Sequence, residues 1–134
     1  MEREVNARME PTTQRTRIIQ HIRNRYGAEP EYLWIKYPNT AAFRHPVGGK
    51  WFALVTEVAR NKLGLSGSEI AHVINVKCDP IMVGSLLSEA GFFPAYHMNK
   101  NSWISILLDS GVPDEKIAEL LELSYDAVAP KRKR

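Results

Sequence analysis

The stretch GGKWFALVTEV, residues 48–58, constrains the fold more strongly than any other part of the chain. Its double glycine suits the positive φ angles of a tight turn, and residues 51–56 then alternate between two faces, as in a strand. The preceding stretch AFRHP, residues 42–46, is short and aromatic and ends in proline, which is typical of a strand near a sheet edge. We therefore predict a hairpin turn that leads into a strand.

The remaining elements are predicted from periodicity and from residues that start or stop helices. Ile18, Ile19 and Ile22 form one stripe behind two threonines and before Gly27, so a helix is expected over 12–26. Asp79-Pro80 is a typical helix start, and this helix should reach about Gly91. Further strands are predicted at 32–38 (YLWIKYP), 72–78 (HVINVKC) and 103–108, and a last helix within 112–129.

The order of these elements indicates the fold class. A helix is followed by three or four strands, a helix, one or two strands and a helix, and most strands run in sequence before the second helix. This order predicts an α+β fold, a two-layer sandwich whose mainly antiparallel sheet is backed by helices. We expect a flexible leader over 1–11, a single domain over 12–129 and a basic tail over 130–134.

Composition excludes several classes of protein. The chain has 134 residues, and no apolar run approaches the roughly 20 residues that a membrane span needs. The first residues carry charges of both signs and resemble no secretory signal. Cys78 is the only cysteine, so the chain has no internal disulfide, and a buried, inert thiol in the reducing cytoplasm is expected.

The charge is unevenly distributed along the chain. The net charge is +3, but the tail KRKR alone carries four positive charges. Residues 36–100 hold seven basic and four acidic residues, whereas residues 101–130 hold one lysine and six acidic residues. The domain is therefore nearly neutral with a basic middle, which is less positive charge than a protein that coats nucleic acid usually carries.

No pattern of catalytic or metal-binding residues is found. His21, His45, His72 and His97 have neither the spacing nor the carboxylate companions of a metal site. The stretch around Lys50 lacks the upstream glycine and the following Ser or Thr of a phosphate-binding loop. We predict a protein without catalytic residues, metal or cofactor.

Two segments imitate a helix-turn-helix. In residues 65–76 the second helix would consist of a β-branched run that favours a strand. In residues 112–134 the segment is acidic before its tail, and phosphate would repel it. Neither is favoured as a reader of DNA.

The stretch PAYHMNKNSW, residues 94–103, is crowded with rings and polar groups. Trp103, like Trp34 and Trp51, is expected to anchor the core. Pro94 fixes the entry to a turn, and we expect His97, Asn99 and Lys100 to face a shared cleft or edge.

Six motifs, in this order and spacing, resemble the MmcQ/YjbR family: KYP, GGKWFALV, VKCDP, PAYHMNKNSWISILLD, VPDEKI and LLELSYDAV. The resemblance extends from residue 10 to about 129. It implies a frataxin-like (CyaY-like) fold and a DNA-binding role through a double-wing motif. This chain departs from the family pattern in the segment RNKLGLSGSEIAH (60–72), which is long for a hairpin link and would alter any wing there.

The first functional hypothesis is a non-enzymatic module that binds DNA through non-specific contacts to phosphate. Its candidate residues are Lys50, Arg60, Lys62, Lys77, His97, Asn99 and Lys100. The alternative is a small-ligand or protein-interaction domain that uses a cleft near Trp103 and His97. A frataxin-like iron site is disfavoured, because the first helix carries arginines where an acidic ridge would be required.

Overall fold

The computed structural model describes residues 13–131. Its helices are α2 (Gln14–Tyr26), the 3-10 helix η1 (Arg60–Leu63), α3 (Pro80–Leu86) and α4 (Asp114–Val128). Its strands are β1 (Ala41–Arg44), β2 (Trp51–Ala59), β3 (Ile70–Lys77), β4 (Phe92–Pro94) and β5 (Trp103–Leu107). Among these residues, no helix combines the length and the apolar character that crossing a membrane requires.

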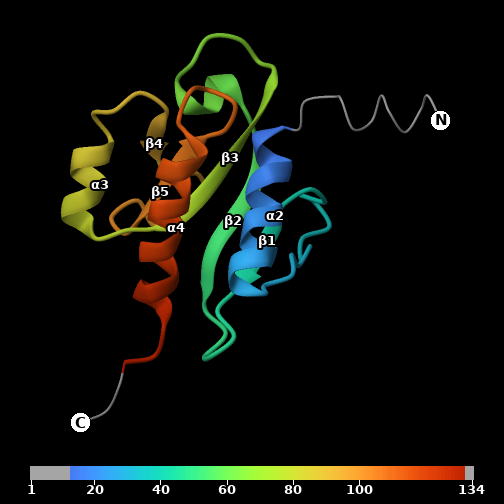
Figure 1. The fold of residues 1–134 in the computed structure, drawn as a ribbon. Coiled ribbons are helices and arrows are strands. Elements are labelled where there is room, and N and C mark those ends of the chain that lie inside the picture. Colours follow the sequence, from blue (N-terminus) through green and yellow to red (C-terminus); the bar gives the residue numbers. More distant parts are fainter. Residues whose placement is uncertain (1–12, 132–134) are drawn as a thin grey trace.

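The five strands form one antiparallel sheet in the order β1-β2-β3-β5-β4 (Figure 1). Strands β1 to β3 form a meander, and the chain then passes through α3 to the far edge before β5 returns to pair with β3. The predicted α+β class with a mainly antiparallel sheet is confirmed.

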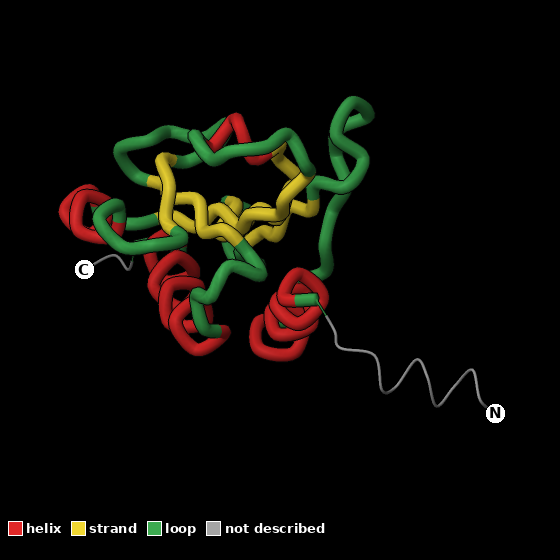
Figure 2. The backbone as a smooth tube through the Cα atoms, turned by 90° about the horizontal axis from the view of Figure 1, so that it is seen from above, coloured by secondary structure: helices red, strands yellow, loops and turns green. Residues whose placement is uncertain are grey.

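Helices α2 and α4 lie side by side on one face of the sheet (Figure 2). Ile18 and Ile22 of α2 are buried against the sheet, as the isoleucine stripe predicted. Ile117, Leu120 and Leu121 of α4 are buried in the same cluster. The core therefore lies between these two helices and the inward side chains of the strands, a two-layer arrangement.

A β-bulge changes which residues of β2 face the helices. Phe43 pairs with Ala53 but Arg44 pairs with Trp51, so Phe52 is the extra residue of β2. Phe52 and Ala53 consequently both join the core beneath the helices. Simple alternation predicted that they would face opposite sides. Beyond the bulge, Leu54 and Thr56 face away from the helices.

The opposite face of the sheet is covered by loops and by the short 3-10 helix η1, whereas α2 and α4 lie on the other side (Figure 2). Val58, Val73 and Leu107 form a second, smaller apolar cluster there. Leu63 and Leu65, from η1 and the turn after it, pack on this cluster. Of the segment 60–72, residues 60–69 therefore form a hairpin link that folds over the sheet and begins with a 3-10 turn, whereas residues 70–72 already belong to β3.

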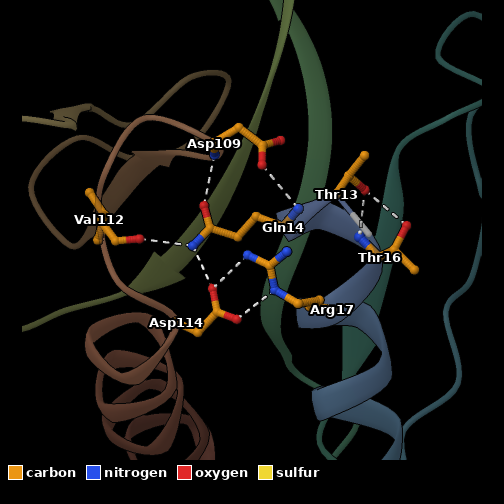
Figure 3. A network of polar contacts seen from close by, with 7 residues as sticks. All are labelled: Thr13, Gln14, Thr16, Arg17, Asp109, Val112 and Asp114. Carbon is orange, nitrogen blue, oxygen red and sulfur yellow. Dashed lines mark hydrogen bonds and ion pairs between the residues drawn. The ribbon is translucent and has the colours of Figure 1, made fainter. Parts of the chain in front are cut away.

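A polar network ties the start of α2 to the turn between β5 and α4 (Figure 3). Gln14 is buried, and its amide nitrogen donates to the Val112 carbonyl oxygen at 2.8 Å and to Asp114 Oδ1 at 2.7 Å. Its amide oxygen accepts from the Asp109 backbone N–H at 2.7 Å, and its backbone N–H donates to Asp109 Oδ1 at 3.1 Å. Arg17 and Asp114 form an ion pair at 2.7 Å beside it.

Three expectations about local structure need correction. Residues 32–38 form turns, with only an isolated bridge between Glu31 and Ala42 nearby. The helix that begins at Pro80 ends at Leu86 instead of reaching Gly91. Trp103 is buried as predicted, but Trp34 and Trp51 are only half-buried. By contrast, the two disfavoured helix-turn-helix readings are absent among the described residues, because strand β3 begins within 65–76 and residues 114–128 form a single continuous helix.

Candidate nucleic-acid interface

Two adjoining hollows are both lined by Trp51 and Met98. The first lies on the sheet face opposite α2 and α4, and the second lies where the sheet meets the C-terminal end of α4. We call the first the aromatic pocket; its lining consists of Trp34, Tyr37, Thr40, Trp51, Leu54, Thr56, Asn75, Tyr96, His97 and Met98. We call the second the basic cleft; its lining consists of Arg44, Gly49, Lys50, Trp51, Lys77, Met98, Trp103, Ala127 and Val128.

The aromatic pocket has a volume of about 140 Å³. Its floor is the sheet, and its walls come from the loop before β1 and the turn after β4. Trp34 meets Trp51 edge to face, with 5.4 Å between the ring centroids. Tyr37 meets His97 in the same manner at 5.7 Å. Rings from three separate segments thus converge on one partly open hollow.

Buried polar pairs in the sheet hold these walls in place. Asn75 and Ser105 face each other in the β3–β5 register and are hydrogen bonded. Asn75 Nδ2 donates to the Tyr96 carbonyl oxygen at 3.0 Å, and the Tyr96 N–H donates to Ser105 Oγ at 2.8 Å. Thr40 and Thr56 are hydrogen bonded in the same way beneath the other loop. Buried polar groups require such partners, so both loops are fixed to the sheet.

His97 adopts a backbone conformation that few residues other than glycine tolerate, with φ at 64°. Its ring stacks on Tyr96 with the centroids 4.0 Å apart. The turn is closed by Lys100 Nζ, which donates to the Ala95 carbonyl oxygen at 3.0 Å, and by the Asn101 N–H, which donates to Asn99 Oδ1 at 2.8 Å. A strained residue held by its surroundings in this way often belongs to a site.

The basic cleft joins three cationic side chains to two tryptophan rings and has a volume of about 420 Å³. Lys77 Nζ lies 5.8 Å from the centroid of the Trp103 ring, and Arg44 Cζ lies 5.6 Å from that of Trp51. Both distances are within the range of cation–π attraction. The lining of the cleft contains no acidic residue.

Two features at the edge of the cleft modify its charge. Arg44 forms an ion pair with Glu31 at 3.0 Å, which offsets part of its charge. Pro130 approaches the turn that precedes Lys50, within 3.6 Å of where a Cβ on Gly48 would lie. Four basic residues, KRKR, follow Pro130 in the sequence, and of these the structure describes Lys131 alone.

The structure separates the seven residues predicted to bind nucleic acid into three groups: residues that line one of the hollows, residues in η1, and residues in the turn between β4 and β5. Lys50 and Lys77 meet in the basic cleft, and His97 lines the aromatic pocket. Arg60 and Lys62 lie in η1, at the opposite end of β2. Asn99 and Lys100 line neither hollow and instead hold the turn between β4 and β5.

Several lining residues escaped sequence reasoning. The sequence predicts Trp34 and Tyr37 within one strand and Arg44 within an edge strand, and it indicates none of the three as a site residue. Thr56 and Asn75 carried a usable signal, because each is a polar residue within an otherwise apolar strand. Such a residue indicates either a hydrogen-bonded core position or a pocket lining. Thr56 and Asn75 are both, because each is buried in the sheet and each lines the aromatic pocket.

The perturbed titratable groups lie elsewhere, among the helices and the turns next to them. Burial raises the pKa of the Tyr26 hydroxyl, whose proton is donated to Glu122 at 2.9 Å. Burial likewise raises the pKa of the Cys78 thiol, in accord with the expected inert cysteine. The Arg17 guanidinium lowers the pKa of Asp114 through a hydrogen bond. Within residues 13–131, no three His, Cys, Asp or Glu side chains group as metal ligands would.

Comparison with known proteins identifies relatives over most of the chain. The YjbR family model matches residues 23–127. The uncharacterised protein YyaQ of Bacillus subtilis is 40% identical over 108 residues, which cover 81% of this chain and 92% of YyaQ. A crystal structure of a Pseudomonas syringae protein superimposes with a TM-score of 0.82 at 37% identity, covering 84% of this chain and 97% of that one.

A more distant structure shares the fold. Deinococcus radiodurans protein DR2400 superimposes with a TM-score of 0.62 at 22% identity, over 82% of this chain and 77% of that one. The family match spans all five strands and every lining residue of the two hollows except Val128. The chain belongs to the YjbR family.

Proposed function

We propose that this protein is a non-enzymatic module that binds nucleic acid through phosphate contacts in the basic cleft. The observation that carries the proposal is the convergence of Arg44, Lys50 and Lys77 between two tryptophan rings, without an acidic residue in the lining. Cationic side chains bind the phosphate backbone without regard to sequence and release counterions as they do so.

The charge of the surroundings supports the same assignment. The acidic residues of the C-terminal helix occupy its first turn and its exposed side, where Asp114 pairs with Arg17 and Glu122 pairs with Arg25. Pro130 lies against the turn that precedes Lys50, and Lys131 follows it directly in the sequence. A nearly neutral domain therefore presents a local positive site to an anionic polymer.

The test compares two double variants that change the net charge equally. Lys50→Ala with Lys77→Ala removes two cleft cations, and Lys62→Ala with Lys116→Ala removes two lysines outside the cleft. Affinity for a labelled oligonucleotide is measured by fluorescence anisotropy over a range of salt concentrations. We expect the cleft variant to bind more weakly and its log–log salt slope to fall by about 1.4–1.8, at 0.7–0.9 per contact. Equal losses in both variants would contradict the proposal.

A second candidate function rests on the aromatic pocket. A concave hollow with several rings and a few fixed polar groups is the usual form of a small-ligand site. A ligand that binds only the native state at 100 times its Kd stabilises it by about 2.7 kcal/mol. A thermal-shift screen against metabolites would favour this alternative if an uncharged compound stabilised the protein and oligonucleotides did not.

A further inference from the structure

We propose that the aromatic pocket binds one unpaired pyrimidine base of a nucleic acid strand whose phosphate occupies the basic cleft. This inference rests on the proposed function and specifies its ligand as single-stranded and pyrimidine-containing. It is carried by the juxtaposition of the two hollows, by the size of the pocket and by its unsatisfied donor.

The two hollows are adjacent in the manner that a nucleotide requires. Trp51 and Met98 form part of both linings. A ligand that spans the two hollows therefore contacts the cations of the basic cleft at one end and the rings of the aromatic pocket at the other, with only these two side chains between them. A nucleotide likewise joins an anionic phosphate to a flat ring through one sugar. Proteins that bind single strands combine a positive groove for the backbone with aromatic side chains on which bases stack.

The size of the pocket selects the smaller base. Its volume is about 140 Å³. An engineered protein cavity of about 150 Å³ accommodates benzene, so a pocket of this size holds one six-membered ring. A pyrimidine has one such ring, whereas a purine would have to leave its second ring outside the pocket.

The polar groups of the pocket match a base better than a hydrocarbon. Trp51 Nε1 is buried and has no hydrogen-bond partner among residues 13–131. Asn75 Nδ2 has two protons, and the Tyr96 carbonyl oxygen is the acceptor for one of them. A pyrimidine carries carbonyl oxygens on its ring, and a small shift of Trp51 would let such an oxygen accept from a donor that otherwise stays unsatisfied.

The test uses the full chain, single strands of about eight nucleotides and a duplex of equal length. Tyr37→Ala removes an exposed wall of the pocket. Tyr32→Ala is its matched control, because Tyr32 is an exposed tyrosine of the same loop that lines neither hollow. Thermal unfolding of both variants verifies that they fold.

We expect wild-type protein to bind oligothymidylate at least about fivefold more tightly than oligoadenylate, as the loss of one stacked base would cause. Tyr37→Ala should abolish this preference and Tyr32→Ala should keep it. A preference that survives in Tyr37→Ala would overturn the inference, because self-stacking of oligoadenylate would then explain it.

The outcomes separate this inference from the proposed function. Equal affinity for both single strands and the duplex, lost in the cleft double variant, would refute the pyrimidine site and leave the phosphate cleft standing. Absence of binding to every oligonucleotide at low salt would refute both. A thymidylate preference that depends on Tyr37 and on the cleft lysines would establish both.

Discussion

Gln14 links the N-terminal helix to the turn before α4, and its truncation should be costly although no large apolar group is lost. Its side chain makes three hydrogen bonds, of 2.7–2.8 Å, with Val112, Asp114 and Asp109 (Figure 3). Only 4% of the residue is exposed, so water does not readily replace these partners. At about 1 kcal/mol for each bond, Gln14→Ala should lower the free energy of unfolding by about 3 kcal/mol.

The assay is urea unfolding followed by tryptophan fluorescence and circular dichroism. With an m-value of about 1–3 kcal/mol/M, the midpoint should fall by about 1–3 M at unchanged m. The control is Gln20→Ala, because Gln20 is an exposed residue of the same helix that bonds only to Asn24 among the described contacts. This control should stay within about 0.5 kcal/mol of the wild type.

Gln14→Glu tests the same reasoning through charge. A carboxylate here cannot donate to Val112 or Asp114 and places a second negative charge beside Asp114. Neighbouring negative charge and burial raise the pKa of a carboxyl, so the variant should be least stable at neutral pH and recover as the new group is protonated. If Gln14→Ala resembled Gln20→Ala and Gln14→Glu showed no recovery in acid, the network would contribute nothing and the reasoning would be wrong.

Further predictions concern single residues. Because Arg17 lowers the pKa of Asp114 in the folded state, the stabilisation from this carboxylate is present above its unfolded pKa of about 3.9 and is lost as pH falls through the folded value. Asp114→Asn should therefore lower the urea midpoint at pH 7 and flatten its dependence on pH below about 4. Trp103→Ala should cost about 3–5 kcal/mol in the same assay, since the ring is 8% exposed and packs in the sheet. Lys100→Ala should cost less than about 1 kcal/mol and leave nucleic-acid affinity within about twofold, because Lys100 is exposed and lines neither hollow.

Periodicity was sufficient to predict the helices and most strands, because each buries one face against a common core. The isoleucine stripe of α2 and the glycine turn before β2 are local signals, and the structure confirms both the helix and the strand that they predict. The same reasoning wrongly predicted that Trp34 and Tyr37 lie in a strand. The preference of aromatic residues for strands reflects packing on a half-buried surface, and a pocket wall offers such a surface without strand pairing.

The grouping of the basic residues could not be predicted, because it depends on strand register. Lys77 ends β3 and Lys50 precedes β2, and the antiparallel pairing of Ala53 with Val76 brings these two ends together. The same pairing places Ile70 opposite Ala59, so Arg60 follows at the far end of β2, roughly 25 Å away along the strand. Counting charges along the sequence could not have shown that Lys50 and Lys77 lie together while Arg60 lies apart from them.

The bulge in β2 determines which face of the sheet becomes the candidate site. With regular pairing, Phe52 would share a face with Leu54 and Thr56, on the side away from the helices. The extra residue instead places Phe52 in the core and leaves Trp51 on the side of Leu54, where it separates the two hollows. A shift of one residue therefore exchanges the two rings, because regular pairing would place Trp51 on the core face with Ala53 and Val55. Bulges recur next to functional sites for this reason, because they redirect a side chain without changing the sheet around it.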